Sequence, residues 1–155
     1  YANLDGFAAY TNLITILSDD KINYNYQKKA IAYLIPLTKF LPDNEESLGY
    51  EKSAYFNLSW YALFEKKFVE AEAAARRVLE LTPEKTGVIS NLASALLFQG
   101  KFAEAKQTYL DHADEPWIDD RHETFREVFL SDLDELEAAG ITHPDVEKVR
   151  ALLSH

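Results

Sequence analysis

The sequence predicts an all-α fold, a solenoid of about three helix–turn–helix units followed by a capping pair of helices. Three observations lead to this prediction. Apolar residues recur at helical spacing through most of the 155 residues. The chain contains only five glycines and five prolines, and no segment shows the sustained alternation that is typical of strands. The middle of the chain also repeats itself, with the period of roughly 34 residues that is typical of stacked helical hairpins.

The N-terminal third is expected to contain two helices, over residues 4–17 and 25–41. Pro36 lies inside the second and removes one backbone donor, so a kink or a break is predicted there. The polar residues 43–49 are interpreted as a connector to the next helix.

Four helices are predicted in the middle of the chain, over residues 55–64, 68–81, 89–96 and 102–109. Proline and glycine mark their ends. Pro83 stops the second helix, because proline cannot continue the backbone hydrogen-bond ladder. Gly100 allows the left-handed conformation that closes the third, and Pro116 ends the region.

The last part of the chain predicts a helix pair. Phe125, Val128, Phe129, Leu133 and Leu136 have helical spacing within a helix expected over 120–140. Gly140 followed by Ile141 predicts a glycine cap with its hydrophobic contact. A final helix is expected after Pro144.

The internal repeat relates residues 52–80 to residues 86–114. A shift of 34 positions aligns eight identical pairs, where chance would give roughly two. The pairs are Asn57/Asn91, Leu58/Leu92, Leu63/Leu97, Phe64/Phe98, Lys67/Lys101, Phe68/Phe102, Glu70/Glu104 and Ala71/Ala105. The chain resembles the tetratricopeptide repeat (TPR) family in these residues and in this period. The resemblance implies a right-handed solenoid and a single domain over 1–155. Its parts would be a degenerate repeat (1–50), two clear repeats (51–85 and 86–115) and acidic capping helices (116–155).

Four small residues are expected where helices cross closely. They are Ser59 and Ala93 on the first helices of the two repeats, and Ala71 and Ala105 on the second helices. A large side chain at any of them would overpack the crossing, at a cost of about 1–3 kcal/mol.

The resemblance also implies where a partner would bind. In this family the first helices of successive repeats line a concave groove that holds peptides or other proteins. The partner-binding residues carried over by position are Phe56, Asn57, Trp60, Phe64, Asn91, Ser94 and Phe98. Many members use asparagines at the positions of Asn57 and Asn91 to bond a ligand backbone, since an amide both donates and accepts. Chaperone-binding members need basic groove residues that this sequence lacks, so a chaperone-tail adaptor is not predicted.

Phe56, Trp60 and Phe64 form one aromatic stripe, because residues four apart lie on one face of a helix. Two interpretations stay open. The stripe could anchor a partner, since aromatic residues are enriched at interface cores. It could instead pack on the helices expected over 4–17 and 26–41.

No residue pattern predicts catalysis or a cofactor. The chain has no cysteine, no nucleophile elbow and no glycine-rich phosphate loop. The acidic pairs Asp119/Asp120 and Asp132/Asp134 are interpreted as solvated. The cluster of His112, Asp114, Asp119, Asp120 and His122 is interpreted as surface acids beside a histidine rather than as a metal site. We therefore predict no metal, no cofactor and no enzymatic activity.

The net charge of −10 is concentrated near the C-terminus. Residues 114–155 contain twelve acidic and four basic residues, whereas residues 51–113 are balanced. A chain this acidic is a poor candidate for nucleic acid or anionic membranes, which bind clustered Lys and Arg. The acidic segment is interpreted as a solvated face, with a docking face for a basic partner as the alternative.

These observations predict a non-catalytic scaffold that binds a peptide or protein segment in its concave groove. The alternative is a self-association module. We expect the domain to be part of a longer chain and other domains of that chain to be among its partners. A cytoplasmic location is favoured, with periplasmic and secreted locations left open.

Overall fold

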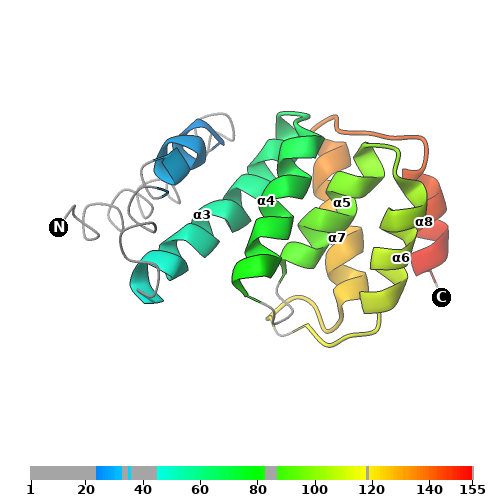
Figure 1. The fold of residues 1–155 in the computed structure, drawn as a ribbon. Helices are drawn as coiled ribbons and strands as arrows, with labels where there is room; N and C mark the ends of the chain where they lie inside the picture. Colours follow the sequence, from blue (N-terminus) through cyan, green and yellow to red (C-terminus); the bar gives the residue numbers. More distant parts are fainter. Residues whose placement is uncertain (1–23, 33–34, 36–44, 83–86, 118, 155) are drawn as a thin grey trace.

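The computed structural model describes residues 24–32, 35, 45–82, 87–117 and 119–154, and this part of the chain is all-α. A helix over 24–32 is followed by six further helices, which pack in chain order, each against the next (Figure 1). Contacts also join α3 to α5, α5 to α7 and α6 to α8. The helices are α3 (Glu45–Phe64), α4 (Phe68–Leu81), α5 (Val88–Phe98), α6 (Phe102–His112), α7 (Phe125–Ala138) and α8 (Val146–Leu153).

The sequence repeat is also a repeat of helix boundaries. Helices α3 and α5 end at one identical pair of the repeat, Phe64 and Phe98. Helices α4 and α6 begin at another, Phe68 and Phe102. The identical residues therefore occupy equivalent places in two helical hairpins.

Two glycine caps confirm predictions made from the sequence. Gly100 has a φ of 78° and Gly140 a φ of 80°. The N–H groups of Gly100 and Lys101 donate to the carbonyls of Leu97 and Leu96, at 2.9 and 3.0 Å. This pair of hydrogen bonds is typical of the Schellman motif, which satisfies carbonyls that a helix end leaves free.

Helix α3 ends in the same motif with a lysine in place of glycine. The N–H groups of Lys66 and Lys67 donate to Leu63 and Ala62 at 3.0 and 2.9 Å, and Lys66 has a φ of 57°. A β-carbon is strained in this conformation. We therefore expect Lys66→Gly to raise the free energy of unfolding by about 0.5–1 kcal/mol, measured by urea denaturation. Gly100→Ala at the equivalent position should lower it, and a loss of stability in Lys66→Gly would contradict the assigned cap.

One predicted boundary is wrong near the start of α3. Residues 45–49 belong to this helix rather than to a connector. The helix predicted over 25–41 is described over 24–32 and at Ile35, where it is helical. The predicted helix over 4–17 and the kink at Pro36 lie outside the described residues.

The start of α7 is also different from the prediction. The helix begins at Phe125, not at 120, because the preceding residues pair with each other. The N–H of Trp117 donates to Glu123 at 2.8 Å, and the N–H of Phe125 donates to Glu115 at 3.0 Å. An isolated antiparallel bridge joins Pro116 to Thr124. This pairing brings residues 115–117 alongside residues 123–125 and uses backbone groups that a longer helix would need.

The core is centred on α5, all eleven residues of which are buried. Neighbouring helices complete it, and the largest fully buried side chains are Tyr109 on α6 and Phe129 on α7. The four small residues predicted at helix crossings, Ser59, Ala71, Ala93 and Ala105, are all fully buried.

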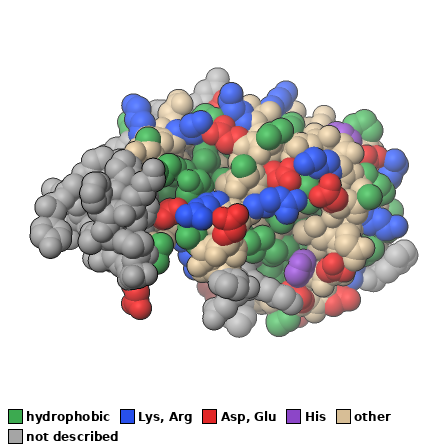
Figure 2. All heavy atoms as spheres, viewed as in Figure 1, with side chains coloured by type: hydrophobic (Ala, Val, Ile, Leu, Met, Phe, Trp, Pro, Cys, Tyr) green, Lys and Arg blue, Asp and Glu red, His purple; other side chains and the backbone are tan. Residues whose placement is uncertain are grey.

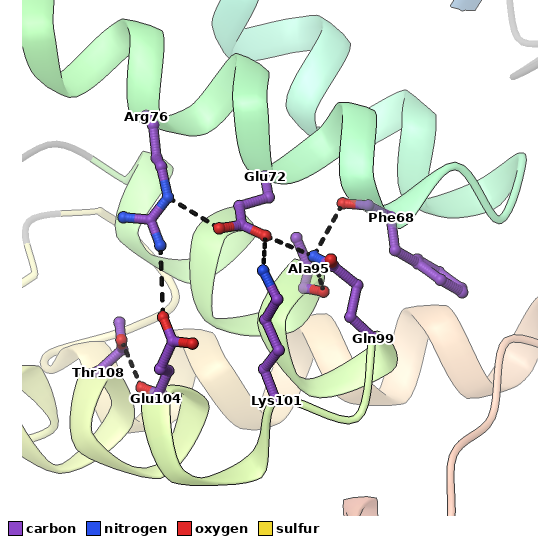
Figure 3. A network of polar contacts seen from close by, with 8 residues as sticks. All are labelled: Phe68, Glu72, Arg76, Ala95, Gln99, Lys101, Glu104 and Thr108. Carbon is purple, nitrogen blue, oxygen red and sulfur yellow. Dashed lines mark hydrogen bonds and ion pairs between the residues drawn. The ribbon is translucent and has the colours of Figure 1, made fainter.

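The surface over α4 and α6 is strongly charged, and acidic and basic side chains alternate across it (Figure 2). Glu72 of α4 lies at the centre of one network (Figure 3). It accepts hydrogen bonds from Lys101 at 2.8 Å, Gln99 at 2.7 Å and Arg76 at 2.9 Å. The network ties α4 to the turn between α5 and α6, and thus joins one hairpin to the next.

Among the helices of the described ranges, none combines the length and the apolar character that crossing a membrane requires.

Candidate functional site

A pocket of about 270 Å³ lies between α3, α5, α7 and the loop that precedes α7. Three aromatic side chains line it: Phe56 and Trp60 from α3 and Trp117 from the loop. Asn57 of α3 and Asn91 of α5 add two amides. The pocket therefore combines apolar surface with a few polar groups, as binding sites commonly do.

The loop residue Trp117 is held in place on both sides. Its indole N–H donates to Asp119 at 2.5 Å, and its ring meets that of Phe125 edge to face, with centroids 5.0 Å apart. Gly87 lies directly beneath it: a β-carbon there would be 2.6 Å from Cη2 of Trp117 and 3.5 Å from Phe56. Only a residue without a side chain fits between the two rings.

Asp119 organises the loop that carries this tryptophan. Its second oxygen accepts the backbone N–H groups of Arg121 and His122 at 2.7 and 2.6 Å. The His122 ring lies 3.0 Å from the carboxylate. The hydrogen bond with this ring, helped by the backbone and indole donors, holds the pKa of Asp119 well below its usual range. The acid thus has a structural role in the wall of the pocket.

The predicted cluster of histidines and acids is divided in space. His122 pairs with Asp119, whereas His112 pairs with Glu115 at 3.0 Å. Within the described ranges no three His, Asp or Glu side chains are placed to hold a metal ion.

Two acidic side chains of α7, Asp132 and Glu135, also line the pocket. Asp132 is half-buried and accepts a hydrogen bond from the Ser90 hydroxyl. Burial raises the pKa of Asp132 to about 6; Glu135 adds to the rise, while Ser90 and His122 oppose it. The interpretation of Asp132/Asp134 as a solvated pair is therefore wrong for Asp132. It holds for Asp134, which is exposed and pairs with Arg150 at 2.8 Å.

The two asparagines have different surroundings. Asn91 is only 4% exposed, and its amide donates to the Ser59 hydroxyl at 2.8 Å. Ser59 in turn donates to the carbonyl of Phe56 at 2.6 Å. Asn57 is half-buried and makes no side-chain hydrogen bond to any residue of the described part. Asn57 is therefore the asparagine whose amide is available to a ligand.

Of the seven partner-binding residues predicted, the pocket brings four together: Phe56, Asn57, Trp60 and Asn91. Phe64 lies beside the pocket, with its ring edge to face against Trp60 at 5.0 Å.

The other two residues, Ser94 and Phe98, lie in the core, at 1% and 6% exposure. Phe98 stacks on Phe68 at 5.3 Å and meets His143 at 6.4 Å, away from the pocket.

The structure answers part of the question about the aromatic stripe. The described helix 24–32 lies against another face of α3: Ile31 shares a separate pocket with Tyr55 and Leu58. Phe56 and Trp60 line the pocket with α5 and α7 instead. The alternative that involves helix 4–17 lies outside the described residues.

Among the residues that line the pocket, sequence reasoning did not assign Trp117, Val128, Asp132 or Glu135 to a binding site. The chain contains only two tryptophans, and both line this pocket. Trp117 was overlooked because it lies in a connector, outside the repeat. The spacing of Asp132 and Glu135, three residues apart on a helix, did signal a shared face. Nothing in the sequence indicated that this face would meet α3 and α5.

Comparisons with protein-family models, with curated proteins and with solved structures found no match to this chain.

Proposed function

We propose that this chain is a TPR-like, right-handed helical solenoid and acts as a non-catalytic scaffold that holds a peptide or protein segment. The segment would bind in the pocket between α3, α5 and α7. The observation that carries the proposal is the convergence of Phe56, Trp60 and Trp117 with the amide of Asn57 in one opening.

The repeated hairpin supports the architectural part of the proposal. Equivalent helix ends fall one repeat period apart, and Lys66 and Gly100, related by the same shift, adopt the same cap conformation. A period of this length is typical of tetratricopeptide repeats. The packing of α3 on α5 and of α5 on α7 places the first helices of successive hairpins side by side, as a concave face requires.

The chemistry of the pocket supports the binding part. Tryptophan and phenylalanine supply large apolar contacts, and tryptophan is frequent among residues that dominate interface energies. The amide of Asn57 can donate to and accept from a peptide backbone. A partner that fills the pocket would cover both tryptophans of the chain, so tryptophan fluorescence reports on this site alone.

We expect Trp60→Ala to weaken peptide binding by about 2 kcal/mol, which is about thirtyfold in Kd. Peptides would be selected from a displayed random library on the wild-type domain, and their affinities measured by tryptophan fluorescence and calorimetry. Leu110→Ala is the matched control, because Leu110 is an exposed hydrophobic residue on α6. Peptides that bind Trp60→Ala as tightly as the wild type would contradict the proposal.

Self-association is the competing function, and light scattering separates the two. If the wild-type domain and the Trp60→Ala variant are both monomeric, the result agrees with the scaffold function. A stable dimer that dissociates in Trp60→Ala would favour assembly through the same face.

A further inference from the structure

We infer that the pocket selects a basic segment, with the side chain of a lysine or arginine placed between the three aromatic rings and the carboxylates of Asp132 and Glu135. The inference rests on the proposed function and adds the chemical class of the partner. It depends on four observations: the charges that line the pocket, their lack of partners, the aromatic walls and the free amide.

The charge of the pocket is of one sign. Asp132 and Glu135 are its ionisable lining residues, and no lysine, arginine or histidine of the described part lines it. The elements that pack around Asp132 present the hydroxyl groups of Ser90 and Tyr109, the carboxylate of Glu135 and the nearby ring of His122. Only His122 can offset the negative charge, and it is already paired with Asp119. An anionic segment would be repelled, whereas a cationic one is complementary.

Two other acids of α7 provide a contrast with Asp132 and Glu135. Asp134 and Glu137 both form ion pairs with Arg150 of α8. Asp132 and Glu135 form no ion pair with any residue of the described ranges. The carboxylate of Asp132 is half-buried, and a half-buried charge without a counter-ion is costly because burial removes water that would stabilise it, whereas Glu135 is exposed. A bound ammonium or guanidinium group would supply the missing partner.

The aromatic residues favour the same occupant. Rings of Trp and Phe attract a cation over their faces, and the attraction grows as water is excluded. Phe56, Trp60 and Trp117 also offer apolar surface to the methylene stem of a lysine or arginine. The amide of Asn57, free of side-chain bonds within the described part, can hold the backbone on either side of the basic residue.

The test uses pools of short random peptides that differ only in a fixed central residue: lysine, arginine, norleucine or glutamate. Binding is followed by tryptophan fluorescence on the whole domain. We expect the lysine and arginine pools to bind about tenfold or more tightly than the norleucine pool, and the glutamate pool to bind least. Equal affinity for lysine and norleucine pools would overturn the inference.

Two variants on one helix locate the effect. Asp132→Asn preserves the size of the side chain and the hydrogen bond from Ser90 but removes the charge. This variant should bind the lysine pool about tenfold more weakly than the wild type. Asp134→Asn removes the same charge from α7 outside the pocket and should leave affinity unchanged. Circular dichroism checks that both are folded. Equal losses of affinity in the two variants would indicate a general electrostatic effect of the acidic surface and would overturn the assignment of Asp132 to the binding site.

The pH dependence gives an independent readout. Because burial raises the pKa of the Asp132 carboxyl to about 6, affinity for the lysine pool should rise between pH 5 and pH 7, and this rise should be lost in Asp132→Asn. If neutral or acidic peptides bind and this binding is lost in Trp60→Ala, the proposed scaffold function is supported and the preference for a basic segment is refuted. Failure of every pool to bind would refute both.

Discussion

Replacing Phe129 by alanine is expected to lower the free energy of unfolding by about 3–5 kcal/mol. Phe129 is fully buried in α7, and its ring meets that of Tyr109 edge to face at 4.9 Å and that of Phe125 at 5.7 Å. The loss combines the transfer of a large side chain out of the core, the cavity left behind and the ring contacts. Because domains of this size are stable by about 5–15 kcal/mol, the effect is a large fraction of the total.

Urea denaturation followed by circular dichroism measures this prediction. Phe129→Leu retains most of the volume and should lose clearly less than Phe129→Ala, which keeps the prediction measurable if the alanine variant fails to fold. Leu110→Ala, at an exposed position on α6, should change stability by less than about 0.5 kcal/mol. A loss below about 1 kcal/mol in Phe129→Ala would mean that α7 is not packed as described.

Glu72→Gln is expected to cost about 1–3 kcal/mol at neutral pH and to flatten the acid limb of the stability profile. Burial opposes ionisation of this carboxyl, but the hydrogen bonds from Lys101, Gln99 and Arg76 outweigh it and lower the pKa of Glu72 to about 2 (Figure 3). The folded pKa lies below the ordinary value of 4.5. The charged group therefore stabilises the fold above pH 4.5, and this contribution is lost as the pH falls from 4.5 towards 2.

Urea midpoints across this pH range distinguish the variants. The wild type should lose more stability than Glu72→Gln between pH 4.5 and pH 2. Glu80→Gln serves as a control, since Glu80 is an exposed partner of Arg77 and its ion pair should be worth less than about 1 kcal/mol. Parallel acid profiles for the wild type and Glu72→Gln would show that the network does not join the hairpins energetically.

Helix bounds could be predicted from the sequence alone where apolar periodicity and a proline or glycine stop signal agree. Helix α4 has the predicted bounds, 68–81, because an apolar stripe of helical period is closed by Pro83. The caps at Gly100 and Gly140 follow from the conformational freedom of glycine. The starts of α3 and α7 were misplaced because helical periodicity alone does not mark where a helix begins.

Half of the candidate site could be predicted in the same way. Phe56, Asn57 and Trp60 share one face of a helix, and the internal repeat related Asn57 to Asn91. Ser94 and Phe98 were assigned by position in the repeat but are covered in the core. Exposure depends on what packs over a helix, and neither periodicity nor repeat position carries that information.

The amino-acid sequence by itself determined the all-α class, the repeat and most helix ends, since these depend on neighbours in the chain. Only the tertiary structure decided which surfaces meet. It brought Trp117 and the acids of α7 to the aromatic face of α3, and it left Asp132 half-buried without a basic partner in the described ranges. The reason is physical: burial and charge pairing arise from contacts between segments far apart in the chain, and those contacts exist only once the helices have packed.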